Sequence, residues 1–203
     1  TKDDKEKILL KYVEQVNILK GQFITGADVG IGDKNIRTMK NSSNFIVGIQ
    51  SNPTLFTAMG LLDATKICVA EILDNSNMSN LEFAIQGVGK IGGEFLRLIY
   101  PGKKIFVADI DKHTIDEAKS NFPKIIAVSP SKIHTKKVDI FSPCALSGTL
   151  NKSTIPQLDT KIIIGGANNQ VRRIDNSRLI FERGIFYAPD YVVNAGGLIS
   201  DVD

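Results

Sequence analysis

The segment Phe83-Ala84-Ile85-Gln86-Gly87-Val88-Gly89-Lys90-Ile91-Gly92-Gly93 places the spacing G-x-G-x-x-G between an apolar stretch and a helical one. The first glycine permits a tight turn, the second lets a ligand approach the backbone, and the third lets helix and strand pack closely. The N-terminus of the helix offers unpaired N–H groups and partial positive charge to an anion. We therefore expect a strand, turn and helix that bind a dinucleotide pyrophosphate through Gly87, Val88, Gly89, Lys90, Ile91, Gly92 and Gly93.

Outward from this segment, short apolar stretches alternate with helical ones. Strands are expected over 81–86, 104–109, 125–128, 138–141 and 161–165, and helices over 91–100 and 114–121. This alternation predicts an α/β domain with a doubly wound, Rossmann-like parallel sheet. Upstream, helical spacing predicts helices over 4–20, ended by Gly21, and over 54–74. We expect a leading segment (1–48), a connecting helix (49–76) and a dinucleotide-binding domain (77–203).

The second expected strand ends in Asp109, 22 residues after Gly87. A carboxylate at this place accepts hydrogen bonds from the adenosine ribose hydroxyls of a dinucleotide. Because its charge would repel a 2′-phosphate, NAD is the expected cofactor rather than NADP. Lys103, Lys104 and Lys112 lie close enough in sequence to reduce that preference.

Composition excludes several classes of function. The chain has 203 residues, of which 42% are hydrophobic, and a formal net charge of only +3, which argues against disorder and against a nucleic-acid partner. Cys68 and Cys144 form no C-x-x-C pair, so neither a disulfide framework nor a metal site is expected. We expect no membrane helix, no secretory signal and a cytoplasmic location. Because the chain opens at Thr1, we expect a piece of a longer protein.

Three later segments carry a more specific signal, namely 141–148 (FSPCALSG), 165–170 (GGANNQ) and 187–197 (YAPDYVVNAGG), and an earlier one is 25–30 (TGADVG). Together and in this order they resemble the glutamate/leucine/phenylalanine/valine dehydrogenase family, with the leucine dehydrogenase branch nearest. The resemblance implies NAD-dependent oxidative deamination of an L-amino acid to a 2-oxo acid and ammonium. It also implies that residues 1–48 end a substrate domain and that the full-length enzyme is a homo-oligomer.

The resemblance also assigns residues. Asp28 matches the aspartate that assists proton transfer at the substrate amine, and Thr57 matches a threonine that touches the cofactor. The positions expected near the nicotinamide half are Ala145, Ala167, Asn168 and Asn194. From residue type alone, Asp28 would be a turn cap and the asparagines ordinary turn residues. Cys144 has no histidine near it in sequence, so we interpret it as a packing residue.

The sequence also departs from the family. The family's catalytic lysine lies in a G-G-G-K segment upstream of the helix that begins here near Asp4, and the chain contains no such segment. We therefore expect the chain alone to be inactive. Gly26 matches the phenylalanine-type enzymes, whereas leucine-type enzymes carry alanine, so leucine, valine and phenylalanine all remain candidate substrates. The alternative is a non-catalytic NAD-binding module, which the coding sequence upstream of Thr1 would distinguish.

Overall fold

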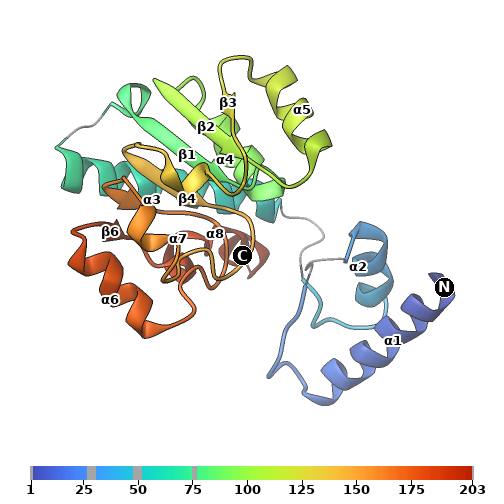
Figure 1. Ribbon diagram of the computed structural model, residues 1–203. Helices are drawn as coiled ribbons and strands as arrows, with labels where there is room; N and C mark the ends of the chain where they lie inside the picture. Colours follow the sequence, from blue (N-terminus) through green and yellow to red (C-terminus); the bar gives the residue numbers. More distant parts are fainter. Residues whose placement is uncertain (1, 27–30, 48–51, 75–76, 203) are drawn as a thin grey trace. The chain divides into compact units, whose positions relative to one another are not determined.

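The computed structural model describes residues 2–26, 31–47, 52–74 and 77–202, and its contacts divide the chain into two compact units (Figure 1). The smaller unit comprises residues 1–53 and 198–203, and the larger comprises residues 54–197. The larger unit contains every residue that the sequence assigns to cofactor binding. The boundaries expected at 48 and 76 stay a prediction.

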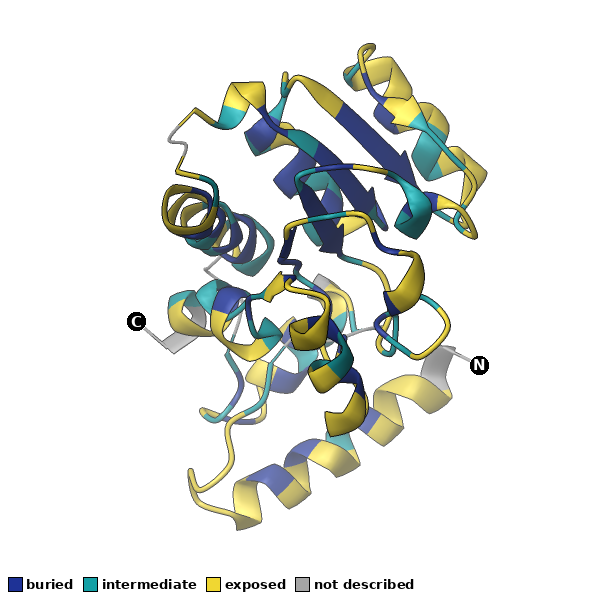
Figure 2. Cartoon of the chain, turned by 60° about the vertical axis from the view of Figure 1, so that its left-hand side comes forward, coloured by how far each residue is buried: buried dark blue, intermediate teal, exposed yellow. Residues whose placement is uncertain are grey.

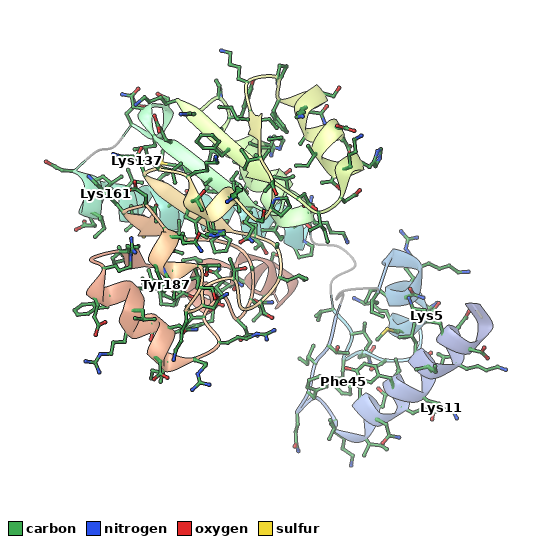
Figure 3. The ribbon with its side chains drawn as sticks, in the orientation of Figure 1. Lys5, Lys11, Phe45, Lys137, Lys161 and Tyr187 are labelled. Carbon is green, nitrogen blue, oxygen red and sulfur yellow. The ribbon has the colours of Figure 1, made fainter. Side chains whose placement is uncertain are left out.

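The smaller unit is built from helices α1 (Lys2–Ile18) and α2 (Asp33–Lys40). After α1 the chain turns at Gly21, whose φ of +86° suits glycine, and the Phe45 ring lies against this turn (Figure 3). Thr25 forms a parallel bridge with Ile46. The hydrophobic core cluster of this unit is formed by Leu9, Val13, Ile36, Met39 and Ile46.

The larger unit contains a six-stranded sheet in which every pair of neighbours is parallel, which confirms the predicted α/β fold. The strand order is β3-β2-β1-β4-β5-β6. The strands are β1 (Glu82–Gln86), β2 (Lys104–Ala108), β3 (Ile126–Ala127), β4 (Ile140–Pro143), β5 (Ile162–Ile163) and β6 (Phe186–Tyr187). The order reverses between β1 and β4, and such a switch point leaves a crevice at the carboxyl ends of the strands.

Helices cover both faces of this sheet. The α-helices of this unit are α3 (Pro53–Leu73), α4 (Lys90–Ile99), α5 (Lys112–Asn121), α6 (Ile174–Glu182) and α7 (Asp190–Val193). Helix α8 (Gly196–Val202) begins in this unit, and its residues from Leu198 onward belong to the smaller one. Short 3-10 turns are η1 (Met78–Asn80), η2 (Ile133–Thr135) and η3 (Ile155–Gln157). Within the described residues, no helix is both long and apolar enough to cross a bilayer.

The alternation of side chains along β1 divides the core into two layers. Phe83 and Ile85 point to the layer formed with α3, α4 and α5, whereas Ala84 points to the layer formed with η2, η3 and α6. Figure 2 shows the central strands as the buried middle of this arrangement. Helix α3, expected as a connector, contributes Ala58 and Leu61 to the first layer. It is therefore part of the core of the larger unit.

The turn from β1 into α4 explains the glycine spacing. Gly87 has a φ of +89°, and a Cβ added there would lie 2.8 Å from Ala145. A Cβ added to Gly92 would lie 1.9 Å from the Gly87 carbonyl oxygen, so only glycine lets the helix pass this close to the strand end. A Cβ added to Gly89 would meet nothing within 4 Å. Gly87 and Gly92 are thus required by the fold, whereas Gly89, which lies between them, has free space around it.

This difference yields a stability prediction. Gly92→Ala should lower the free energy of unfolding by about 3 kcal/mol, because the backbone of α4 or β1 must shift to admit the methyl group. Gly89→Ala is the matched control and should unfold within about 1 kcal/mol of the wild type. Thermal unfolding followed by circular dichroism measures both. Equal stability of the two variants would contradict the close contact at Gly92.

Candidate functional site

The carboxyl ends of the parallel strands bring together the predicted cofactor residues of the larger unit. The glycine turn follows β1, Asp109 follows β2 and Ala145 follows β4. Asn168 comes after β5, and Asn194 comes after β6. Asp28 lies outside the residues that the structure describes.

The N-terminus of α4 has the properties of an anion site. Gly89 is the N-cap residue, is exposed, and has no side-chain capping hydrogen bond. The Gly93 N–H donates to the Gly89 carbonyl at 2.7 Å, whereas the N–H groups of the first turn have no partner inside the helix. With the helix dipole, these groups attract negative charge. Lys90 is exposed and borders a groove between α4 and α5.

Asp109 is fixed by two backbone hydrogen bonds. Its Oδ2 accepts from the Val88 N–H at 2.9 Å, and its Oδ1 accepts from the Asp111 N–H at 3.0 Å. The first bond ties the glycine turn to the end of β2. Each carboxylate oxygen can accept a further hydrogen bond, so the group can still bind hydroxyls of a ligand. The sequence predicts the ligand contact, whereas the bond to the glycine turn is visible only in the structure.

A cavity of about 250 Å³ opens beside Asp109. Gly87 and Ala145 border it, and Ile110, Pro130 and Leu146 add apolar surface. An apolar cavity with one oriented carboxylate suits a flat, weakly polar group attached to a sugar. Ala145 thus lies beside the glycine turn and shares a cavity with Asp109, and its expected place near the nicotinamide half stays a prediction.

Asp111, the next carboxylate along the chain after Asp109, has a capping role. Its Oδ1 accepts from the His113 N–H at 3.0 Å and its Oδ2 accepts from the Thr114 hydroxyl at 2.7 Å, so it caps α5. The hydrogen bond from Thr114 is the main reason why the pKa of this carboxyl is lowered. Asp111 is not among the residues that border the cavity.

Two of the three lysines near Asp109 in sequence are at the other end of β2. Lys104 is the first residue of that strand, and Lys103 pairs with Glu82 at 3.2 Å. Lys137 and Lys161 likewise precede β4 and β5, at the amino edge of the sheet (Figure 3). Of the three lysines near Asp109 in sequence, Lys112 is the one that follows β2 on the carboxyl side.

The two predicted asparagines form a pair. The Asn194 Nδ2 donates to Asn168 Oδ1 at 2.7 Å and to the Gly166 carbonyl at 3.3 Å. Their neighbour Ala167 is buried. Thr57 is buried in α3, where its Cα would lie 3.3 Å from a Cβ added to Gly196. Asn168, Asn194 and Thr57 therefore occupy the β5–β6 side of the switch point.

Gln170 and Asp190, which the sequence does not single out, hold these segments together. Gln170 is fully buried, and its backbone N–H donates to Asp190 Oδ2 at 3.0 Å. Both residues lie inside the quoted segments 165–170 and 187–197, which is the only sequence signal that pointed to them.

Cys144 has the surroundings of a packing residue. Burial raises the pKa of its thiol, which keeps the group protonated and unreactive. Its Sγ lies 3.4 Å from the Ser142 hydroxyl and accepts from the Gly166 N–H at 3.4 Å. These contacts hold the turn after β5 close to the end of β4.

Comparison with other proteins identifies relatives of the whole chain. L-tryptophan dehydrogenase of Nostoc punctiforme is 39% identical over 200 residues, which cover 96% of this chain and 56% of that protein. Leucine dehydrogenase of Bacillus cereus is 35% identical over 209 residues, which cover all of this chain and 57% of that protein. The chain therefore spans little more than half the length of these relatives.

Solved structures agree with the sequence relatives. The crystal structure of L-tryptophan dehydrogenase from Nostoc punctiforme matches 97% of this chain and 58% of that chain, with a TM-score of 0.82 and 36% identity. The hetero-hexameric glutamate dehydrogenase from Thermus thermophilus has a TM-score of 0.74 at 15% identity, over 99% of this chain and 55% of that one, and shows the same fold.

The profile of the Glutamate/Leucine/Phenylalanine/Valine dehydrogenase family matches residues 104–201, from β2 into α8. This range includes Asp109 and the three later segments on which the sequence resemblance rests. Together with the relatives that extend over the glycine turn, it confirms that resemblance, and the chain belongs to the glutamate/leucine/phenylalanine/valine dehydrogenase family, near its leucine dehydrogenase members.

Proposed function

We propose that the chain is the NAD-binding part of an amino-acid dehydrogenase that deaminates a branched-chain or aromatic L-amino acid to its 2-oxo acid and ammonium. The observation that carries this proposal is the open N-terminus of α4, where Gly89 leaves its surroundings free, next to the fixed carboxylate of Asp109. The relatives' names, leucine, phenylalanine and L-tryptophan dehydrogenase, support this class of substrate. No observation favours a non-catalytic module.

The residues present fit a dinucleotide whose adenosine half lies beside β2 and whose nicotinamide half lies beside β5 and β6. The strand order separates two halves about β1 and β4, so an extended dinucleotide crosses the switch point with its pyrophosphate at α4. In this proposal, Asp109 and the adjoining cavity hold the adenosine half. Ala167, Asn168, Asn194 and Thr57 hold the nicotinamide half. When bound, the nicotinamide supplies the acceptor for the hydride that leaves the amino acid.

The surroundings of Asp109 support NAD rather than NADP. The carboxylate is held by the Val88 and Asp111 N–H groups, so it cannot swing away from a 2′-phosphate without breaking both bonds. Lys103 and Lys104 are at the opposite end of β2 and give a phosphate no compensation. Of the three lysines, Lys112 remains on the same side as Asp109, so we infer a preference for NAD that depends mainly on the Asp109 carboxylate.

The rest of the reaction rests on residues beyond those described. We propose Asp28 as the group that moves protons between the substrate amine and the attacking water, as the family resemblance implies. The same resemblance supports a homo-oligomeric, cytoplasmic enzyme in which an upstream lysine completes the site.

The chain itself should bind NADH. Titration followed by NADH fluorescence or calorimetry should give saturable binding, because the glycine turn, Asp109 and the asparagine pair are all present. Gly89→Ala should weaken binding about tenfold or more without loss of fold, since its methyl group enters the space left for the pyrophosphate. Absence of saturable binding by the folded wild type would refute the proposed function.

Asp109 should determine the choice of cofactor. Asp109→Ala should weaken NAD binding ~10–100-fold, because charge-assisted hydrogen bonds to the ribose are lost. It should also bring the dissociation constants for NAD and NADP closer together, because the repulsion of the 2′-phosphate disappears. Asp111→Ala is the matched control. It should cost ~1 kcal/mol of stability as a lost helix cap and leave both dissociation constants unchanged. If instead Asp111→Ala weakens NAD binding and Asp109→Ala does not, Asp111 makes the ribose contact.

In the longer protein that contains this chain, Asp28→Asn should lower kcat by ~10²–10⁴-fold, because the amide keeps the shape of the side chain but cannot accept the proton. The dissociation constant for NAD should change little. Steady-state kinetics with the preferred amino acid, combined with NADH titration, separate the two effects. Preserved turnover with a stability loss of ~1 kcal/mol would mean that Asp28 only caps a turn.

A further inference from the structure

The buried amide of Gln170 supports the turn that follows β5. Its Nε2 donates to the Gly165 carbonyl at 2.6 Å and to the Ala167 carbonyl at 2.9 Å. Both donors of the side chain are therefore used on two backbone oxygens of one turn. The turn in question presents Asn168 to the carboxyl edge of the sheet.

The same residue connects this turn to α7. The Gln170 N–H donates to Asp190 Oδ2 at 3.0 Å, and the other oxygen of Asp190 accepts from the Tyr191 N–H at 2.9 Å. At the end of α7, the Asn194 N–H donates to the Asp190 carbonyl at 3.0 Å. Asp190 thus joins Gln170 at one end of α7 to Asn194 at the other.

The side-chain oxygen of Gln170 suggests why a glutamine is used. Oε1 is buried and has no hydrogen-bond partner among the described residues. An unpaired buried acceptor lowers the stability of the fold, so stability alone would not favour a glutamine here. The side chain acts through its two N–H donors, which hold the turn after β5. Gln170 is also the last residue before the bridge between Leu150 and Val171, so its position relative to a second loop is fixed.

We propose that Gln170 and Asp190 are positioning residues for the nicotinamide half of the cofactor. They hold the turn after β5 and helix α7 at the spacing at which Asn194 Nδ2 and Asn168 Oδ1 meet at 2.7 Å. Neither touches the cofactor itself. This inference rests on the proposed NAD-binding function, and it assigns the recognition of one end of the dinucleotide to the two residues that keep the asparagine pair assembled.

The test compares two ligands that differ only at that end. ADP-ribose has the adenosine, pyrophosphate and second ribose of NADH but lacks the nicotinamide ring. Gln170→Met keeps the length of the side chain and removes both donors. Its affinity for ADP-ribose should stay within about twofold of the wild type, and its preference for NADH over ADP-ribose should fall about tenfold. Calorimetric titration of the chain with each ligand measures the ratio.

Two further variants keep the test decisive. Asp190→Asn leaves one acceptor for two N–H groups and should lower the same ratio, even if Gln170→Met fails to fold. Asn176→Leu is the matched control, because Asn176 is another buried amide with an unpartnered oxygen, and its Nδ2 donates to the Leu150 carbonyl at 3.2 Å. It should change stability but leave the ratio unchanged.

The outcomes separate this inference from the function on which it rests. If the wild type binds neither NADH nor ADP-ribose, the proposed function is wrong. If the wild type binds both without preferring NADH, or if Asp190→Asn and every folded Gln170 variant keep the wild-type ratio, the positioning role is wrong and cofactor binding stands. If Asn176→Leu also lowers the preference for NADH over ADP-ribose, the loss in the Gln170 and Asp190 variants reflects general loss of packing, and the positioning role is wrong.

Discussion

The close contact between Gly92 and the Gly87 carbonyl is the constraint on which the site depends. A Cβ at Gly92 would lie 1.9 Å from that oxygen, so α4 can begin directly over the end of β1 only with glycine there. This position aims the first turn of α4 at the crevice, where its unpaired N–H groups can meet an anion. A longer connection would move the helix dipole away from the switch point.

The site on either side of this turn is held by hydrogen bonds to backbone groups. On one side, Asp109 ties the glycine turn to β2 through the Val88 N–H. On the other, Gln170 and Asp190 tie the turn after β5 to α7, and Cys144 holds Gly166 near the end of β4. These side chains are buried or partly buried and bond to backbone groups, so they hold the proposed ligand contacts in place and reduce the entropy that binding would have to overcome.

Much of the fold follows from local pattern. The helix predicted over 54–74 is α3 (Pro53–Leu73), and the strand predicted over 104–109 is β2 (Lys104–Ala108). The glycine spacing predicted both the turn and the free space at Gly89. The strands β3, β5 and β6 are only two residues long, and their extent was less predictable because a short strand is defined by its neighbours more than by its own residues. Strand pairing and order depend on contacts between distant segments, which no local pattern specifies.

By itself, the sequence determined the class of fold and the glycine turn, because both depend on local pattern and backbone geometry. It also predicted Asp109 as a ribose contact from its place at the end of a strand, and the resemblance to the family added the two asparagines as predicted cofactor residues. Only the tertiary structure decided that Asn168 and Asn194 form a pair and that Asp109 accepts a hydrogen bond from the Val88 N–H. It also decided the hydrogen bonds of Gln170, whose partners lie in three separate segments. Hydrogen bonds act over about 3 Å, and only folding brings residues that are 20 or more positions apart within that distance.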